Sequence, residues 1–379
     1  MCSRNAIRFG RHARFRMMRL ALAALMLAVP QAASAADRPA IDISGDVRLR
    51  LEQDWDSQTE TGAKREERTR ARFRARLRGK ADLDGGFIAR AQVRTTGQSQ
   101  QSANITFADF DGNPEDDLKV LLDQYSVVWQ RGSVGAEVGR MAFPFFTSNE
   151  YLWDNDVSVL GLSGNVSLPL PGSGKLKFNG GAFKLPVGPT QLSGKLFAGQ
   201  AVLERGHIVL AAGLFRFDAD RGDKDRLRLL DGNGGRDYAI LSLNAQYKLR
   251  AASKPLVLGA DLYRNLQGYR GALDSISRAH ANRRTGYVLS AGWGDTSKPG
   301  RLEVGYRWFR MEKLAVNGSY AQDDTFRAGT GTDLKGHDIY ANYAVTRVLT
   351  LGIRAAAVER LITREGGKRV RLDLTYRFN

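Results

Sequence analysis

The sequence contains very little cysteine and histidine, the residues that build disulfides, zinc sites and many catalytic centres. Its one cysteine, Cys2, lies close to the N-terminus, and there are four histidines. No Cys or His pair has the spacing of a zinc site, and no Gly-x-Ser-x-Gly motif of a hydrolase is present. We therefore expect no disulfide, no metal, no cofactor and no catalytic residue. An enzyme stays open as a rival class, which a hydrolysis screen with lipid and peptide substrates would reveal.

One acidic segment, residues 109–117, begins like a calcium-binding loop. Asp109, Asp111 and Asn113 occupy alternate positions in it. However, no glycine stands at the sixth position and no helical pattern flanks the segment, as a calcium loop of that type requires. We interpret it as a solvated acidic loop.

Long hydrophobic runs are missing as well. Residues 20–29, LALAALMLAV, form a run of ten residues, too short to cross a bilayer as a helix. Six arginines and no acidic residue precede the run, and Ala33-Ser34-Ala35 has the small-x-small form of a cleavage site. These features predict a secretory signal peptide over residues 1–35, with Met1, Met17 or Met18 as the true start, and an exported chain over residues 36–379.

Acidic residues are outnumbered by basic ones, 40 against 57, which gives a net charge of +17. An excess of this kind is typical of nucleic-acid binding. Here, however, the basic residues recur at every second position opposite apolar ones, which places them on strand faces. We therefore expect no nucleic-acid partner, and we expect some basic loop residues to contact lipopolysaccharide phosphates.

A strict alternation of apolar and polar residues is the dominant pattern of the chain. It is clearest in residues 41–52, 68–80, 87–94 and 302–308. A period of two puts one set of side chains on each face of a β-strand, whereas a helix would scatter them around its circumference. One face of each predicted strand is therefore apolar and the other is wet. In the second strand, Phe73 belongs to the apolar face and Arg74 to the wet face.

The predicted connections alternate between short and long. Seven short turns fall near residues 82–85, 131–133, 171–174, 205–207, 252–255, 295–300 and 346–347. Eight longer polar loops fall near residues 54–67, 97–117, 142–157, 186–192, 218–236, 265–283, 311–336 and 361–367. This pattern predicts an all-β fold: one transmembrane antiparallel up-and-down β-barrel of about sixteen strands, with fourteen or eighteen as open alternatives. Closure is expected because every backbone N–H and C=O group must be paired in lipid.

Several short segments carry a family resemblance. They are GDVRLR at 45–50, the arginine-rich residues 68–80, LDQY at 122–125, VGRM at 138–141 with Pro144-Phe145, and WDND at 153–156 with Gly161-Leu162. In these segments the chain resembles the bacterial putative porin family and, more distantly, alginate-export barrels. The resemblance implies an outer-membrane channel that is often a homotrimer, but it supplies no substrate. The C-terminal strand, which ends on Phe378-Asn379, resembles the signal that barrel-assembly machinery reads.

The pattern also nominates residues for the lumen. The predicted pore-lining residues are Arg48, Arg50, Arg70, Arg72, Arg74, Arg76, Arg90 and Arg94. Glu52 is expected to be the only carboxylate on the inward face of the first three strands. Residues 142–157 are predicted to fold into the lumen as a constriction loop, with Phe145, Phe146, Glu150, Trp153, Asp154 and Asp156 as its functional side chains.

These residues predict a passive outer-membrane pore for small hydrophilic solutes with a modest anion preference, because basic rings favour anions. Two alternatives stay open. One is a substrate-specific export or uptake channel for an anionic saccharide or organic acid. The other is a non-conducting structural or adhesive barrel, which single-channel conductance would distinguish from a pore.

Overall fold

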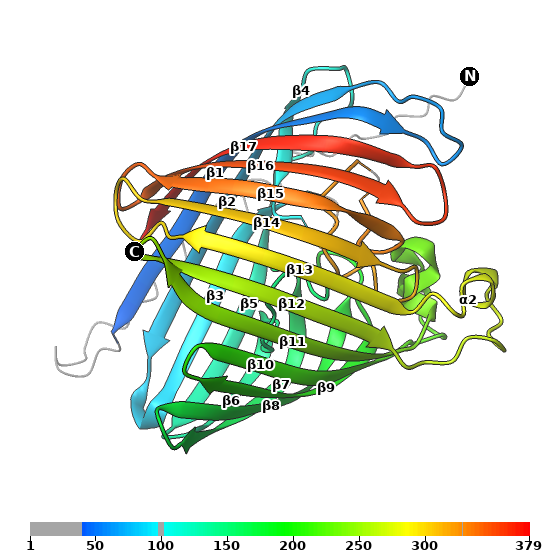
Figure 1. Cartoon of the computed structure of the whole chain (residues 1–379). Coiled ribbons are helices and arrows are strands. Elements are labelled where there is room, and N and C mark those ends of the chain that lie inside the picture. Colours follow the sequence, from blue (N-terminus) through cyan, green and yellow to red (C-terminus); the bar gives the residue numbers. More distant parts are fainter. Residues whose placement is uncertain (1–39, 98–101, 328) are drawn as a thin grey trace, which may run out of the picture. The chain divides into compact units, whose positions relative to one another are not determined.

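One antiparallel β-sheet of seventeen strands closes on itself as a barrel (Figure 1). The computed structural model describes residues 40–97, 102–327 and 329–379. The predicted signal peptide lies outside the described residues. The barrel unit covers Ile41–Asn379. It closes where the first strand pairs with both the second and the last, so the sheet has no free edge there.

The strands follow one another around the barrel in chain order. They are β1 (Ile41–Gln58), β2 (Arg68–Asp82), β3 (Phe87–Thr96), β4 (Ile105–Asp109), β5 (Lys119–Arg131), β6 (Val134–Ala142), β7 (Ser158–Leu170), β8 (Gly174–Pro186), β9 (Leu192–Arg205), β10 (Ile208–Asp218), β11 (Tyr238–Ala251), β12 (Lys254–Asn265), β13 (Thr285–Gly294), β14 (Leu302–Met311), β15 (Leu334–Ala344), β16 (Leu349–Arg360) and β17 (Gly366–Phe378).

Two of the seventeen strands share one place in the barrel. β3 pairs with the later part of β2, from Arg76 to Asp82, and β4 pairs with its earlier part, from Arg70 to Phe73. β4 therefore continues the line of β3 along the same edge of β2, and the barrel has sixteen strand positions. The prediction of about sixteen strands in an antiparallel up-and-down barrel is confirmed.

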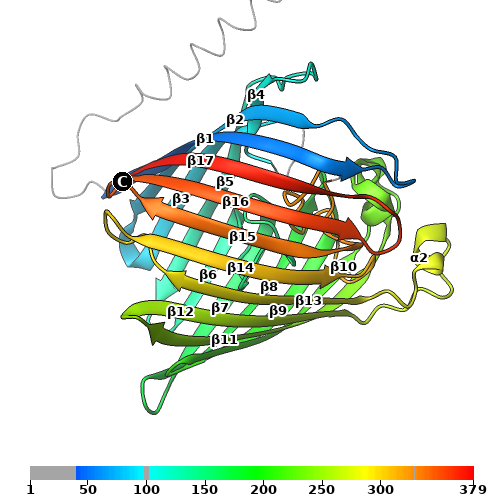
Figure 2. The ribbon, with the colours of Figure 1, turned by 45° about the horizontal axis from the view of Figure 1, so that its top comes forward.

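The connections alternate as the sequence predicts. Short turns gather at one end of the barrel and long loops at the other, as the two views of the ribbon show (Figures 1 and 2). Within the part of the chain that the structure describes, the helical segments are four short ones: η1 (Asp84–Gly86), η2 (Lys224–Arg228), η3 (Leu230–Gly235) and α2 (Ser275–Ala279). Among the described residues, no helix has the length and apolar character needed to cross a membrane.

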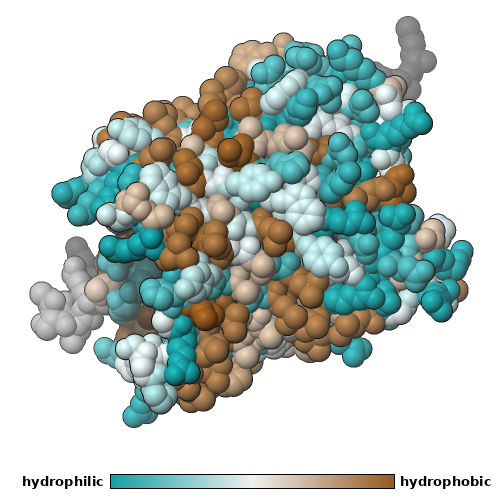
Figure 3. Space-filling view, in the orientation of Figure 1, coloured by the Kyte–Doolittle hydropathy of each residue, from teal (hydrophilic) through white to brown (hydrophobic). Residues whose placement is uncertain are grey.

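The period of two sorts the side chains between the two faces of the wall. On the outer face Leu49 of β1 and Leu77 of β2 are 47% and 50% exposed, whereas Arg72 and Arg74, on the inner face of β2, are buried. Figure 3 shows apolar surface across the middle of the barrel and hydrophilic surface toward the two ends. This is the surface of a barrel that sits in lipid, because only the belt between the two polar ends meets hydrocarbon.

Candidate functional site

The inner wall of β1, β2 and β3 carries all eight arginines predicted to line the pore. They are Arg48 and Arg50 on β1, Arg70, Arg72, Arg74 and Arg76 on β2, and Arg90 and Arg94 on β3. The register of the sheet brings the arginines of neighbouring strands level with one another, so that Arg48 lies opposite Arg74 and Arg50 opposite Arg72. Arginines directly opposite one another on neighbouring strands repel, so carboxylates are needed between them to stabilise this part of the sheet.

Carboxylates do lie between them, in a network that spans the seam where the barrel closes. Ten arginines of β1, β2 and β17 each have a nitrogen within 4.0 Å of a carboxylate oxygen of the network: Arg48, Arg50, Arg68, Arg70, Arg72, Arg74, Arg76, Arg78, Arg369 and Arg371. Six carboxylates serve them: Asp46, Glu52, Asp54, Asp156, Asp324 and Asp373. With all sixteen groups ionised, the network has an excess of four positive charges.

Glu52 is the centre of this network and is fully buried. It lies between Arg70 of β2 and Arg371 of β17, whose Nε atoms donate to its carboxylate at 2.7 and 2.9 Å. Arg72 and Arg369 also approach it, each with a nitrogen at 3.6 Å. One carboxylate thus holds arginines from the second and the last strand against the first, on both sides of the seam.

The expectation that Glu52 is the only carboxylate on this face is wrong. Asp46 and Asp54 share the inward face of β1, because both stand an even number of residues from Glu52. Asp46 accepts hydrogen bonds from Arg74 and Arg76, both at 2.8 Å. The positive charge of the β2 arginines is therefore partly neutralised by carboxylates of β1. The surplus of positive charge on this wall is smaller than the sequence suggests.

Arg90 and Arg94 lie outside this network, on β3. The Nε of Arg94 is 3.1 Å from Asp123 of β5, and both side chains are almost completely buried. Arg90 is about half exposed, with a nitrogen 3.8 Å from Glu137 of β6. The two arginines of β3 thus lie apart from the other six predicted residues. Arg94 forms a buried ion pair with Asp123 that joins β3 to β5.

The loop at residues 143–157, between β6 and β7, reaches across the inside of the barrel. On one side the amide of Asn149 donates to Asp261 of β12 at 2.6 Å. On the other side Asp156 is 3.4 Å from Arg76 of β2. Because the loop contacts strands on both sides of the lumen, it occupies the position that a constriction requires.

The six residues predicted for this loop differ in the contacts that they make. Phe145 and Trp153 are buried in apolar surroundings, and the backbone N–H of Phe146 donates to Gln200 of β9 at 2.8 Å. Glu150 accepts a hydrogen bond from Asn155 at 2.7 Å, and Asp154 is buried. Asp156 alone of the six has an ion pair with the arginine network among the described residues.

A second loop, residues 312–333 between β14 and β15, also lies inside the barrel, and sequence reasoning missed it. Its Tyr320 stacks on Trp153 with ring centroids 5.0 Å apart, and its carbonyl accepts from the N–H of Asp154 at 2.7 Å. Its Asp324 is 3.4 Å from Arg50 and 3.1 Å from Arg371. The buried apolar residues of this loop, such as Leu314 and Phe326, were a signal, because solvated loops are rarely so apolar.

The two loops divide the interior into unlike halves. Toward β8 to β16 they pack with inward side chains into one hydrophobic cluster that includes Phe215, Phe309 and Tyr320. Phe143 stacks on Trp153 within it, with centroids 4.4 Å apart and planes 6° from parallel. The arginine network lies on the opposite wall. The carboxylates that the two loops contribute to this wall, Asp156 and Asp324, are in direct ion contact with its arginines.

Four carboxylates of the two loops have altered pKa values: Asp154, Asp323, Asp324 and Asp333, and burial raises the pKa of Asp333 to about 6. Burial, together with the charges of Glu150 and Asp156, raises the pKa of Asp154 well above its ordinary value. Burial and the neighbouring Asp324 raise the pKa of Asp323 to about 7. For Asp324 burial also acts upward, but the nearby Arg371 and Arg50 prevail and hold the pKa well below its ordinary value. Asp323 is therefore one loop group that titrates near neutral pH.

We expect the lumen to become more attractive to anions as the pH falls through 7. Protonation of Asp323, whose pKa is about 7, removes one negative charge beside the arginine network, so the excess of positive charge grows. Reversal potentials in a salt gradient, recorded between about pH 8 and pH 6, measure the change. Asp323→Asn should show the low-pH preference at both values. An equal pH dependence in that variant would assign the effect to another group.

Among the described residues, no group of three or more His, Cys, Asp or Glu side chains is arranged to hold a metal ion. In the acidic segment 109–117, Asp109 accepts hydrogen bonds from the backbone N–H groups of Asp111 and Asn113, at 3.0 and 3.1 Å. Its oxygen is thus used within the loop itself.

Comparison with known proteins gives a family and a fold. A family model described as "Gram-negative porin" matches residues 21–377. No curated protein sequence matches the chain. Among solved structures, a triple mutant of the Rhodopseudomonas blastica porin is 14% identical with a TM-score of 0.50, covering 89% of this chain and all of that one. An anion-selective porin from Comamonas acidovorans is 13% identical, with a TM-score of 0.49 and coverage of 90% and 100%. OccK1 (OpdK) of Pseudomonas aeruginosa is 12% identical, with a TM-score of 0.48 and coverage of 89% and 98%.

Proposed function

This chain belongs to the Gram-negative porin family, and from that premise we propose that it is a passive pore for small hydrophilic solutes with a modest preference for anions. The family places the protein in the outer membrane, in contact with lipid and lipopolysaccharide, and makes its function that of a channel rather than an enzyme. The selectivity and the residues responsible for it are what we propose beyond the family.

The observation that carries the proposal is the surplus of arginine on the inner wall. Ten arginines share six carboxylates across β1, β2 and β17. Alternate residues of a strand are about 7 Å apart, which is within the Debye length of about 8 Å at physiological salt, so their fields overlap. Anions therefore meet an attractive wall. The surplus of four charges already includes Asp156 and Asp324 of the loops, so these carboxylates reduce the attraction without cancelling it.

Reversal potentials in a salt gradient test the selectivity directly. We expect wild-type protein to prefer anions and Arg72→Glu/Arg74→Glu to shift toward cations. Arg76→Gln/Arg78→Gln is a gentler variant, since Asp46 still accepts from Arg74 at 2.8 Å. The matched control is Lys184→Gln/Lys195→Gln, which removes two charges from paired, exposed positions of β8 and β9. Cation preference in the wild type, or equal shifts in the control, would overturn the proposal.

A selective uptake or export channel for an anionic saccharide or organic acid is the second candidate. It is favoured by the two inward loops, because their aromatic cluster takes up lumen space that a wide, unselective pore would leave to water. In the same recordings, such a channel would show a small conductance that an organic anion blocks and a neutral sugar does not. A well-folded barrel without any conductance would instead support a structural or adhesive function.

Three further expectations accompany this proposal. Residues 1–35 act as a cleaved signal peptide, the C-terminal strand β17 is recognised by the barrel-assembly machinery, and the barrel functions as a homotrimer. N-terminal sequencing of the purified protein and its mass in mild detergent test the first and the third.

A further inference from the structure

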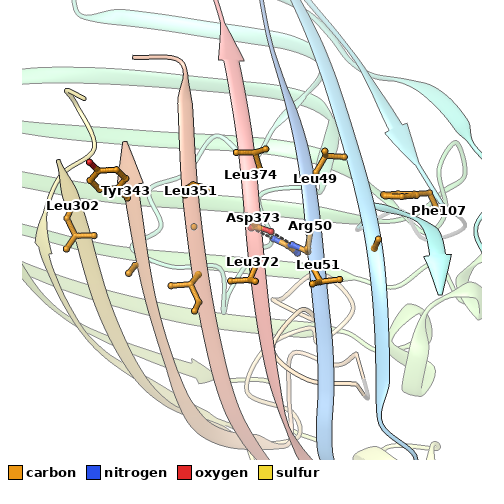
Figure 4. A pocket seen from close by; sticks show the side chains of 14 residues that line it. Leu49, Arg50, Leu51, Phe107, Leu302, Tyr343, Leu351, Leu372, Asp373 and Leu374 are labelled. Atoms are coloured by element: carbon orange, nitrogen blue, oxygen red, sulfur yellow. Dashed lines mark hydrogen bonds and ion pairs between the residues drawn. The ribbon is translucent and has the colours of Figure 1, made fainter. Parts of the chain in front are cut away.

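The cations of the inner wall differ in whether carboxylates accompany them. On the seam side each arginine of the network has a carboxylate close by, and Figure 4 shows one such pair, in which Arg50 donates to Asp373 at 2.7 Å. Toward the short-turn end of β8, in contrast, Lys175 and Lys177 have no carboxylate oxygen within 4.0 Å among the residues that the structure describes. These two lysines can therefore bind a passing anion without losing an internal partner.

Both lysines point into the lumen. Each stands an even number of residues from Asn179, which is buried on the inward face of β8. Asn179 lies opposite Gln200 of β9, where the loop at 143–157 is attached, and the lysines follow on the side of the short turn. Lys175 is exposed and Lys177 is half-buried, so a solute between the loop and the short-turn end can reach both.

The surroundings of the two lysines carry little negative charge. On the inward face of β7 to β11, toward the short-turn end, the described residues include one carboxylate, Glu204, and two further cations, Lys248 and Arg250. Glu204 lies opposite Lys175 in the register, yet their charged atoms are more than 4.0 Å apart. The excess of positive charge on this part of the wall therefore remains after Glu204 is counted.

An aromatic side chain of the loop at 143–157 lies beside these lysines. Phe146 is half-buried and packs against three buried residues of β9 and β10: Val202, Val209 and Ala211. Val202 is directly opposite Lys177 in the register, and neighbouring strands are about 4.8 Å apart. The N–H of Phe146 donates to Gln200 at 2.8 Å, which fixes the loop at this place. The aromatic ring and the ammonium groups are thus neighbours on one wall.

A ring beside two free cations suits an anion that itself carries a ring. Aromatic rings attract one another in offset or edge-to-face arrangements, beyond the effect of the area that they bury. A lysine ammonium is a compact charge with three donors on a flexible stem, so it can follow a carboxylate whose position the ring sets. An anion without a ring gains only the lysines, and a neutral aromatic molecule gains only the ring.

We propose that Phe146, Lys175 and Lys177 form a second anion subsite, which takes small organic anions with an aromatic ring, such as aromatic carboxylates. The ring of the solute packs on Phe146, and its carboxylate contacts the two lysines. The subsite lies across the lumen from the arginine network. This inference rests on the proposed function, because the solute must enter the lumen, and it adds the chemical class of the solute.

Fluorine NMR of the full-length protein in detergent micelles, titrated with para-fluorobenzoate, tests the proposal without requiring conduction. Trifluoroacetate is the matched anion without a ring. We expect wild type to bind fluorobenzoate roughly fivefold more tightly than trifluoroacetate, because one aromatic pair adds attraction of that order. Phe146→Leu should remove this difference, since leucine keeps the packing against the wall and lacks the ring. Lys175→Gln/Lys177→Gln should bind fluorobenzoate roughly tenfold more weakly, because its carboxylate loses charged donors.

The matched control is Lys184→Gln/Lys195→Gln, which removes two exposed lysines from the outward face of β8 and β9 and should bind like wild type. Equal affinity of wild type for both probes, or equal losses in the lysine variant and its control, overturns the proposal. Loss of fluorobenzoate binding in Arg76→Gln/Arg78→Gln but not in the lysine variant also overturns it, because the probe would then bind the arginine network. Reversal potentials in potassium chloride involve no ring, so the proposed function can fail while this subsite binds its probe, and the reverse.

Discussion

Glu52→Gln is expected to produce the largest loss of stability of any single substitution in the barrel wall. The Glu52 carboxylate is fully buried, and arginines of β2 and β17 donate to it across the seam. Removing one partner of a buried ion pair costs about 3–5 kcal/mol, because the other charge stays buried without compensation. Here four arginines lose their shared anion. Arg72, Arg369 and Arg371 keep Asp324 or Asp54. Arg70 keeps no carboxylate within 4.0 Å among the described residues, because its one ion pair is with Glu52.

The loss is measured as a lower urea midpoint and as a lower temperature at which the folded barrel unfolds on a gel. Glu204→Gln is the control, since Glu204 is an exposed carboxylate of β9 without an ion pair among the described residues, and surface changes of that kind stay within about 0.5 kcal/mol. In a double-mutant cycle, Arg70→Gln should recover part of the stability of Glu52→Gln, because it removes one of the stranded cations. Wild-type stability in Glu52→Gln would show that the network does not hold the seam.

Trp153→Ala is expected to give the largest rise in conductance of any single substitution. Trp153 is 2% exposed, stacks between Phe143 and Tyr320, and donates from its indole nitrogen to the carbonyl of Val157 at 2.9 Å. Truncation of a buried tryptophan costs about 3–5 kcal/mol. That loss loosens the loop at 143–157 against the loop at 312–333, because two backbone hydrogen bonds then remain without the stacked rings between the loops.

Single-channel recordings in planar bilayers measure the result as a higher conductance with more open-channel noise. Deletion of residues 146–152 should raise the conductance further, because it removes the segment that crosses toward β12. Trp129→Ala is the matched control, since this tryptophan lies near a short turn on β5, away from both loops. A well-folded Trp153→Ala barrel with unchanged conductance would show that the loop does not narrow the pore.

The sequence allowed the wall of the barrel to be predicted closely, but much less of its interior. Alternation placed Arg72 and Arg74 on the inner face, and the same rule applied to β17 would have placed Arg369 and Arg371 there too. The second inward loop could not be found by that rule, since it has no period. Only its unusual apolar content, with Leu314 and Phe326, set it apart from a solvated loop.

By itself the sequence determined the strand faces, the alternation of turns and loops, and hence a barrel of about sixteen strands. These properties are local, because side-chain direction in a strand depends on odd and even positions and turn length depends on a few residues. The tertiary structure alone decided which charges meet. Glu52 and Arg371 are 319 positions apart, and Arg50 and Asp324 are 274 apart. Only the closing of the sheet and the folding of both loops into the lumen bring them together, so the balance of charge in the pore is a property of the fold and not of any segment of the chain.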